Sequence, residues 1–381
     1  MKKKSLIFSL FITLLYKQDG RAQIIPQFDH VVIVIMENHS YSSIIGSPDA
    51  PYINSLVNGT FCANFTQSYG LTYPSQPNYL MLFSGSNQGV TSDSYPSGQP
   101  FTTPNLGAGL LAASYTFAGY SEDLPSVGYN GSTSGNYVRK HNPWVNWQNA
   151  PQNGIPSISN QPFTNFPLDF TILPTVSFVI PNQVHNMHDP AGSPSAIING
   201  DSWLQNNLEA YIQWAKSNNS LLILTFDEDD GSESNRIVTL FVGENVLKGE
   251  YSEHIDHYTV LRTLEDMYGL PYAGNSAVAT PITNCWTFPT EIQDLEIRER
   301  VNLFPNPATE NFMINFYSDR QQNVKIAVKD LLSKTIVTIN KTMIAGDNYI
   351  QLPIENFISG TYFVNVVSSE NNVVKKVVVK K

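Results

Sequence analysis

Side chains able to bind a cation follow a strongly apolar stretch near the start of the chain. Residues 31–35 are five β-branched residues in a row, typical of a strand buried on both faces of a parallel sheet. Glu37 and Asn38 come just after it, where open α/β sheets bind their ligands. Carboxylate and amide oxygens at that place suit a divalent cation. The alternative is that Glu37, Asn38 and Ser40 only cap a helix beginning at Tyr41.

Two further apolar stretches end in side chains of the same kind. Residues 175–180 precede the segment P-N-Q-V-H-N-M-H-D, which contains His188, and residues 221–226 precede D-E-D-D-G, which contains Asp227 and Glu228. Each segment alone could be a solvated turn. Because parallel strands place their carboxyl ends at one edge of a sheet, the three segments together predict a site for metal-assisted hydrolysis.

A serine precedes an apolar helical segment in T-Y-P-S-Q-P-N, residues 72–78. Ser75 is either the cap of that helix or a nucleophile activated by the helix N-terminus and a nearby metal. Phosphoryl transfer needs a nucleophile, a cation and donor groups around the phosphate. Lys and Arg are scarce near these motifs, so histidine is expected to supply the donors, which predicts better activity in mild acid.

The elements that must position these residues alternate between strands and helices. This alternation predicts a mostly parallel sheet sandwiched by helices, an α/β fold. One expected helix covers residues 203–216, with Asp201 as its N-cap. From residue 301 the pattern alternates with period two, which predicts a small C-terminal antiparallel β-sandwich. We therefore expect a catalytic domain over residues 23–290, a linker over 291–300 and the sandwich over 301–381.

The composition indicates an exported protein. Residues 1–22 combine a basic start, a short apolar run and small residues, as in a secretory signal peptide. Without five basic residues and one acidic residue of this segment, the formal charge of the 381-residue chain falls from −10 to −14, which argues against nucleic acid as a partner. No other apolar run reaches membrane-spanning length. Cys62 and Cys285 could form a disulfide or remain two buried thiols.

Several motifs resemble the phosphoesterase family of acid phosphatases and phosphatidylcholine-type phospholipases C, within the alkaline-phosphatase-like superfamily. They occur in consistent order over residues 28–289. The resemblance implies one divalent ion, and a phosphate ester or a phospholipid head group as substrate. The motifs are M-E-N-H-S-Y-S-S-I-I-G, Y-P-S-Q-P-N-Y, K-H-N-P-W, P-N-Q-V-H-N-M-H-D, G-D-S-W-L, F-D-E-D-D-G and D-H-Y-T-V-L-R-T-L-E-D-M-Y-G-L-P.

The resemblance also implies roles for single residues. S-Q-P-N is similar to the T-F-P-N of nucleotide pyrophosphatases, which makes Ser75 the expected nucleophile and a metal ligand, with Asn78 contacting the phosphate. The other implied metal ligands are Glu37, Asn38, Asp227 and Glu228, and the implied catalytic histidines are His141, His188 and His257.

Two positions depart from the family pattern. Tyr73 stands where relatives often carry His, and Asn186 where they often carry Asp. The first change could remove an acid for the leaving group, and the second could alter the surroundings of a ligand. His185 and His254 are candidates to compensate.

The tail resembles the C-terminal sorting domain of the type IX secretion system. It begins V-N-L-F-P-N-P-A at residue 301 and ends K-K-V-V-V-K-K. A carbohydrate-binding or adhesion sandwich would lack both features. The tail implies export through the periplasm by this machinery, to the cell surface or the medium. Together these observations predict a secreted acid phosphatase acting through a phosphoserine. The alternatives are a phospholipase C and a binding module on a degenerate phosphatase scaffold.

Overall fold

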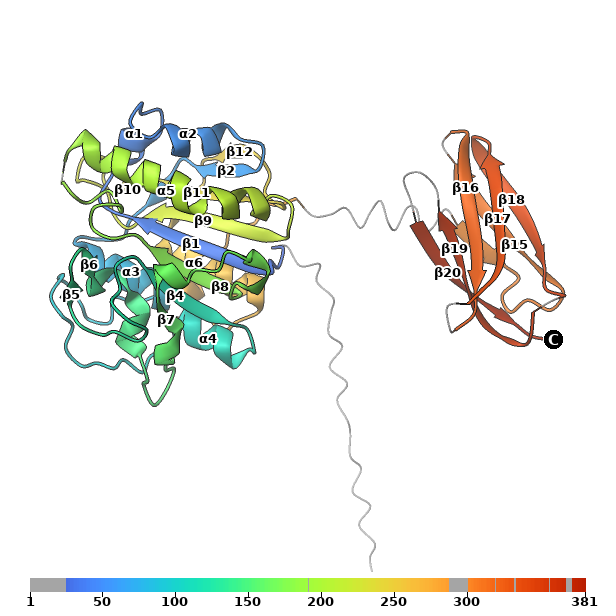
Figure 1. The fold of residues 1–381 in the computed structure, drawn as a ribbon, viewed down its shortest axis with the longest axis horizontal. Coiled ribbons are helices and arrows are strands. Elements are labelled where there is room, and N and C mark those ends of the chain that lie inside the picture. Colours follow the sequence, from blue (N-terminus) through green and yellow to red (C-terminus); the bar gives the residue numbers. More distant parts are fainter. Residues whose placement is uncertain are drawn as a thin grey trace, which may run out of the picture. The chain divides into compact units, whose positions relative to one another are not determined.

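The chain divides into two compact units, Met1–Thr287 and Phe288–Lys381 (Figure 1). The computed structural model describes residues 25–190, 192–287, 301–318, 320–331, 334–355, 357–367 and 372–381. The expected signal peptide and linker lie outside these described residues. Within them, no helix is both long enough and apolar enough to cross a membrane.

An eight-stranded sheet forms the centre of the first unit, in the order β12-β2-β11-β9-β1-β8-β4-β7. Strand β11 runs antiparallel to its neighbours β2 and β9, and every other pair in this sheet is parallel. The prediction of a mostly parallel sheet is therefore confirmed. The strands are β1 (His30–Met36), β2 (Cys62–Phe65), β4 (Phe117–Ser121), β7 (Asn160–Pro162), β8 (Val176–Ile180), β9 (Ser220–Phe226), β11 (Thr239–Gly243) and β12 (Gly249–Tyr251).

Helices cover both faces of this sheet (Figure 1). Successive residues of β1 point to opposite faces. Val31 and Ile33 join one apolar cluster with α3 (Ser75–Ser84), α4 (Leu106–Ala112) and α6 (His257–Tyr268). Val32 and Val34 join a second cluster with α1 (Tyr41–Ile44), α2 (Pro51–Asn58) and α5 (Pro194–Ala215). This double coverage explains why β1 is apolar on both faces.

Short elements complete the first unit. Strands β3 (Ser68–Tyr69), β10 (Arg236–Ile237) and β13 (Ile255–Asp256) form a small sheet, and β5 (Thr133–Ser134) pairs with β6 (Tyr137–Val138). The 3-10 helices are η1 (Arg139–His141), η2 (Pro143–Trp147), η3 (Ser157–Ser159), η4 (Phe163–Asn165), η5 (Phe170–Ile172) and η6 (Gly274–Val278).

Asp201 does not begin a helix, and the prediction that it would is wrong. Helix α5 starts at Pro194 and is capped by Ser193, so Asp201 lies inside it. The buried Asp201 carboxylate accepts hydrogen bonds from the backbone N–H groups of Tyr52 and Ile53, each at 2.8 Å. These donors lie in the first turn of α2, whose own N-cap position makes no side-chain bond. Asp201 therefore caps a different helix, a contact between elements that its sequence neighbours could not reveal.

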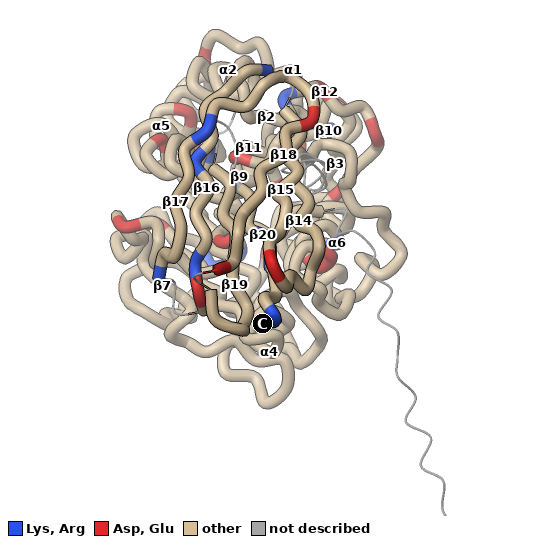
Figure 2. Tube along the Cα trace, turned by 90° about the vertical axis from the view of Figure 1, so that its right-hand side faces the viewer, with Lys and Arg blue, Asp and Glu red and all other residues tan. Residues whose placement is uncertain are grey.

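The second unit is the predicted antiparallel β-sandwich. All its strand pairs described are antiparallel, and one apolar core joins residues of both sheets. Lysines line the neighbouring strands β16 and β17 (Figure 2). The sheets contain β14 (Val301–Phe304), β15 (Asn311–Ser318) and β18 (Gly346–Pro353), and β16 (Gln322–Lys329), β17 (Thr335–Met343), β19 (Gly360–Val367) and β20 (Asn372–Val379).

Both cysteines belong to the first unit. Cys62 and Cys285 are buried free thiols. Of the two alternatives for them, the separate thiols are the ones found, and burial raises the pKa of the Cys62 thiol to about 12.

Candidate active site

Ser75 lies at the first position of helix α3, at the carboxyl-terminal edge of the central sheet. Its hydroxyl is buried and has three oxygen neighbours from two strand ends. The Ser75 Oγ atom is 3.1 Å from Glu37 Oε2, 3.4 Å from Asn38 Oδ1 and 3.4 Å from Glu228 Oε1. The structure therefore brings together residues that lie far apart in the sequence but were expected at one site.

Asn38 follows β1 in the left-handed conformation, with φ of 51°, a conformation that Asn tolerates better than most residues. Its backbone N–H donates to Asp227 Oδ1 at 3.2 Å. Ser40 occupies the N-cap position of α1 but makes no side-chain cap bond. The capping alternative for this segment is therefore wrong, and Glu37 and Asn38 face the Ser75 hydroxyl instead.

Three carboxylates converge on this cluster. Asp227 and Glu228 directly follow β9, and both are buried, as is Glu37. Burial first, and then the charge of Glu37, raises the pKa of Glu228 to about 8. The same two causes hold the pKa of Asp227 well above its usual range. The negative charges of the three carboxylates repel one another, and a bound cation would relieve this repulsion.

Glu37 has two aromatic neighbours that keep it ionised. Burial acts to raise its pKa, but His141, Lys140 and the Tyr79 hydroxyl lower the pKa to about 2. Tyr79 donates its hydroxyl proton to Glu37 Oε1. His141 Nε2 lies 3.2 Å from the same oxygen without an aligned hydrogen bond.

The tautomer of His141 follows from Asn186. The Asn186 amide oxygen accepts the backbone N–H of His188 at 2.9 Å, which directs the amide nitrogen toward His141 Nδ1 at 3.5 Å. Nδ1 then faces a donor, so the proton of the neutral imidazole is on Nε2. Burial lowers the pKa of His141 while the charge of Glu37 acts to raise it, and Nε2 carries a proton in both the neutral ring and the imidazolium. Asn186 is thus a neighbour of His141 on the side away from Glu37.

Asn78 lies one helical turn after Ser75 and supports the cluster. Its amide nitrogen donates to Glu228 Oε2 at 3.0 Å and to the Thr72 carbonyl at 2.7 Å. Its oxygen accepts the backbone N–H groups of Leu71 and Thr72. These bonds use both ends of the Asn78 amide to hold Glu228 and the loop before α3.

The other two predicted catalytic histidines lie outside the first contacts of Ser75. His257 is buried and its Nε2 lies 2.6 Å from the backbone carbonyl of Asp227, so it supports the loop that carries a predicted ligand. His188 is partly exposed and its Nδ1 lies 2.8 Å from Asp189 Oδ1. Neither imidazole has a hydrogen bond to Ser75 or Glu37 among the described residues.

The two histidines expected to compensate for Tyr73 and Asn186 also have their contacts away from Ser75. His185 bonds Glu122 through Nδ1 at 2.9 Å, and His254 stacks on Tyr69. At the departure before Ser75, the Tyr73 hydroxyl donates to Asp229 Oδ1.

Tyr79 is the site residue that the sequence analysis missed. It lies four residues after Ser75, so both occupy one face of helix α3. The spacing S-x-x-N-Y could have revealed it, but an aromatic residue in an apolar helix is more often part of the core. The structure makes it both: the ring stacks on His141 with 5.1 Å between centroids, and the hydroxyl reaches Glu37.

The residues at Ser75 fit a divalent cation. Asp227 Oδ2 is buried and has no hydrogen-bond partner in the described residues, which leaves it free to bind an ion. The donors around it are oxygens, as hard cations prefer. Within the described ranges, no three His, Cys, Asp or Glu side chains alone form a metal cluster. The candidate set therefore needs the Ser75 hydroxyl and the Asn38 amide as well as the carboxylates.

The family match and the names of two relatives support a hydrolase that acts on phosphate esters. The family model described as the Phosphoesterase family matches residues 47–271. The chain belongs to this family. A second family model, the secretion system C-terminal sorting domain, matches residues 302–380, which confirms the prediction for the tail and indicates secretion to the cell surface or beyond.

Two relatives are phosphatases by name. The chain is 49% identical over 268 residues to a phosphatidylinositol-3-phosphatase of Mycobacterium tuberculosis, covering 70% of this chain and 85% of the relative. It is 28% identical to an acid phosphatase of Aspergillus fumigatus, covering 65% of this chain and 56% of that protein, less than two thirds of its length.

A solved structure is similar in outline. It is a protein of the alkaline phosphatase superfamily from Vibrio parahaemolyticus, with 11% identity, a TM-score of 0.47 and coverage of 87% of this chain and 84% of the other. This similarity is too weak to support a statement about activity.

Proposed function

We propose that the protein is an exported, metal-dependent acid phosphatase that hydrolyses phosphomonoesters through a phosphoserine at Ser75. The observation that carries this proposal is the position of Ser75 Oγ. It lies at a helix N-terminus within 3.1 to 3.4 Å of oxygens of Glu37, Asn38 and Glu228. A hydroxyl so placed can lose its proton and attack phosphorus.

The reaction has two displacements at phosphorus. Ser75 Oγ forms a bond to phosphorus while the bond to the substrate's alcohol oxygen breaks, and the alcohol leaves with a proton. Water then attacks the phosphoserine, which releases phosphate and restores the serine. Glu37, Asn38, Ser75, Asp227 and Glu228 would hold the ion. A bound divalent ion lowers the pKa of the serine hydroxyl and neutralises phosphate charge.

The chain's own donors have separate roles in this proposal. His141 carries a proton on Nε2 with no aligned protein acceptor, so it can donate to a phosphate oxygen. Asn78 fixes the Glu228 carboxylate rather than binding phosphate, since its amide is already occupied. His257 positions Asp227 through its backbone carbonyl. His188, which is partly exposed, is the proposed acid for the leaving group.

A lipid-linked phosphomonoester is the second candidate substrate. The name of the Mycobacterium relative, a phosphatidylinositol-3-phosphatase, supports it, because that enzyme's substrate by name is a phosphate on a lipid head group. The phospholipase C alternative instead requires cleavage of a phosphodiester, for which no residue of the described site gives a specific argument.

A substrate panel with two variants tests the proposed function. Metal-loaded protein should hydrolyse p-nitrophenyl phosphate faster at about pH 5 than at about pH 7.5, and should leave phosphatidylcholine intact. Ser75→Ala and Asp227→Ala should each lower kcat by about a thousandfold or more. Ser55→Ala, which removes a hydroxyl of α2 that donates to the Tyr52 carbonyl, is the matched control. Turnover in both site variants equal to the parent would refute the site.

A further inference from the structure

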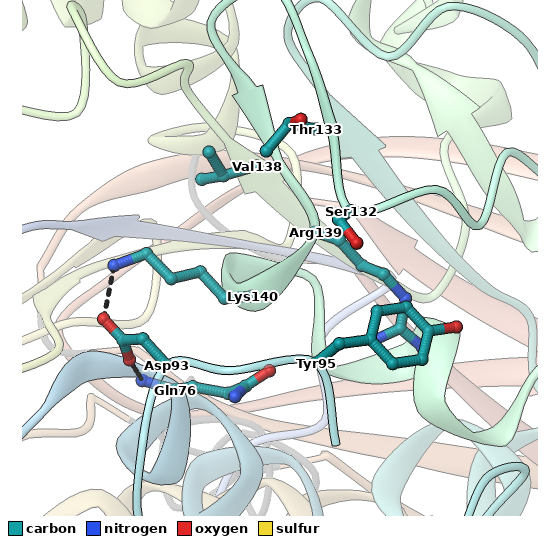
Figure 3. A pocket seen from close by; sticks show the side chains of 8 residues that line it. All are labelled: Gln76, Asp93, Tyr95, Ser132, Thr133, Val138, Arg139 and Lys140. Atoms are coloured by element: carbon teal, nitrogen blue, oxygen red, sulfur yellow. Dashed lines mark hydrogen bonds and ion pairs between the residues drawn. The ribbon is translucent and has the colours of Figure 1, made fainter. Parts of the chain in front are cut away.

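A cavity of about 300 Å³ opens beside the Ser75 cluster, between the segment after α3 and the η1 turn. Figure 3 shows Lys140 and Asp93 at one end and Tyr95 with Arg139 at the other. Gln76 forms part of its lining. None of these residues belongs to the donor set for the ion, although the charge of Lys140 lowers the pKa of Glu37.

Two residues that line the cavity are next to residues of the reaction site in the chain. Gln76 directly follows Ser75, and its backbone N–H donates to Asp93 Oδ1 at 3.0 Å. Lys140 directly precedes His141, whose ring faces Glu37. A substrate with its phosphorus at Ser75 and its alcohol portion directed to the side of Gln76 and Lys140 would reach this cavity.

The charges lining the cavity do not cancel. Lys140 Nζ bonds Asp93 Oδ2 at 2.6 Å, which balances one positive charge. Arg139 is buried and bonds the amide oxygens of Asn130, at 2.7 Å, and of Asn146, at 2.9 Å. In the described parts of the chain no carboxylate forms an ion pair with Arg139. One positive charge thus remains, and a buried cation without a counter-ion is unfavourable.

Lys140 has the capacity to bind an anion. An ammonium group carries three donors, and within the described residues Lys140 Nζ makes a single bond, to Asp93. Arg139 lies over the Tyr95 ring, 4.4 Å from its centroid, which makes the far end of the cavity a rigid wall. The size suits a leaving group of several carbons, and the charge suits one that is itself acidic.

We propose that this cavity is the subsite for the leaving group and that Lys140 makes the enzyme favour phosphomonoesters whose alcohol carries a second anionic group. The proposal rests on the proposed function. Asp93 reduces the preference for such substrates because it competes with the substrate's second anionic group for the Lys140 ammonium group.

A pair of substrates that differ in one group tests the subsite. Sorbitol 6-phosphate and 6-phosphogluconate share a linear six-carbon chain and one phosphomonoester, and differ only in a terminal hydroxymethyl or carboxylate group. The parent protein should show a kcat/KM about tenfold higher for the gluconate ester, chiefly through KM. Lys140→Gln should remove this preference. Asp93→Asn keeps an acceptor for the Gln76 N–H and should enlarge the preference.

The matched control is Lys248→Gln, which removes a positive charge from an exposed lysine of the same unit that bonds the Asn58 carbonyl. It should keep the parent's preference. Equal rates for both esters in the parent, or a preference that survives in Lys140→Gln, would overturn the subsite. Equal losses on both esters in Lys140→Gln would overturn it too, since Lys140 would then act on the common phosphate. Hydrolysis of p-nitrophenyl phosphate in each preparation shows separately whether the proposed function holds, and if no preparation hydrolyses it, both proposals fall.

Discussion

The two carboxylate oxygens of Glu37 have different partners in the site. One carboxylate oxygen lies 3.1 Å from Ser75 Oγ, and the other receives the Tyr79 hydroxyl and faces His141. One edge of the carboxylate is therefore available to a cation while the protein holds the other. The sequence predicted Glu37 as a ligand because it follows an apolar strand, a local pattern. Tyr79 was missed because its role depends on a contact between β1 and α3.

Replacing Tyr79 by Phe tests the support of Glu37. The change leaves a buried carboxylate short of one charge-assisted hydrogen bond, which costs about 1.5–3 kcal/mol. We expect weaker metal binding and a loss of about ten- to a hundredfold in kcat/KM, measured by metal titration and phosphatase assay. Tyr211→Phe removes a buried hydroxyl that bonds the Leu221 carbonyl, and it should lower stability without this loss. Equal kinetic effects in the two variants would contradict the role of Tyr79.

Metal removal should make the stability of the protein depend on pH. In metal-free protein the pKa of Glu228 is raised to about 8 by burial and by Glu37. Between the ordinary Glu pKa of 4.5 and this value the folded state binds more protons than the unfolded chain. Buried histidines with lowered pKa values act in the opposite direction below about pH 6.5, so the melting temperature should fall as pH rises from about 6.5 to about 8.

Glu228→Gln provides the comparison for that experiment. Measured by thermal unfolding after chelation, this variant should lose less stability than the parent over the same pH range, because it has no carboxyl to ionise. Metal-loaded parent should also lose less, since the cation stabilises the ionised form. A chelated parent whose melting temperature is flat or rises with pH would contradict the proposed repulsion.

Helices and strands were predicted well wherever their pattern was local. The run at 31–35, the helix after Ser75 and the alternating tail were expected close to the observed elements. Contacts between elements were not predicted. Asp201 caps α2 from within α5. Side-chain direction at a loop depends on packing that one-dimensional spacing does not encode.

Gly119 in β4 tests the packing of the sheet on η2. A Cβ atom there would lie 2.1 Å from Trp144 Cε2, and Trp144 is fully buried. Gly119→Ala should destabilise the catalytic unit by about 3 kcal/mol, measured by urea unfolding. Gly109→Ala in α4 is the control: its nearest neighbour, Leu270 Cδ1, would be 3.7 Å away, so stability should stay equal or rise by up to about 1 kcal/mol. Similar changes in the free energy of unfolding for the two variants would show that the close approach of Trp144 does not exclude a side chain at position 119.

The two units of the molecule have separate cores. Among the described residues, the apolar clusters of the catalytic unit end at Trp286, and the members of the sandwich cluster lie between Val301 and Val379. The sorting-domain match covers residues 302–380 only. The sequence predicted two parts because strands alternate with helices up to about residue 290, whereas the pattern from residue 301 alternates with period two.

Deleting residues 301–381 should separate catalysis from export. We expect the shortened protein to fold and to hydrolyse p-nitrophenyl phosphate at the parent's rate, because no catalytic candidate lies in the removed part. In a host with type IX secretion machinery, cell fractionation should find it retained inside the cell envelope. A folded shortened protein without activity would contradict the independence of the units.

The most direct test of the account is the chemical state of Ser75 during turnover. Metal-loaded protein mixed with p-nitrophenyl phosphate and quenched in acid within the first turnover should yield a peptide phosphorylated at Ser75, detected by mass spectrometry. Ser75→Ala should give no phosphopeptide and almost no hydrolysis. Rapid hydrolysis with the Ser75 peptide unmodified at every quench time, or unchanged hydrolysis by Ser75→Ala, would contradict it.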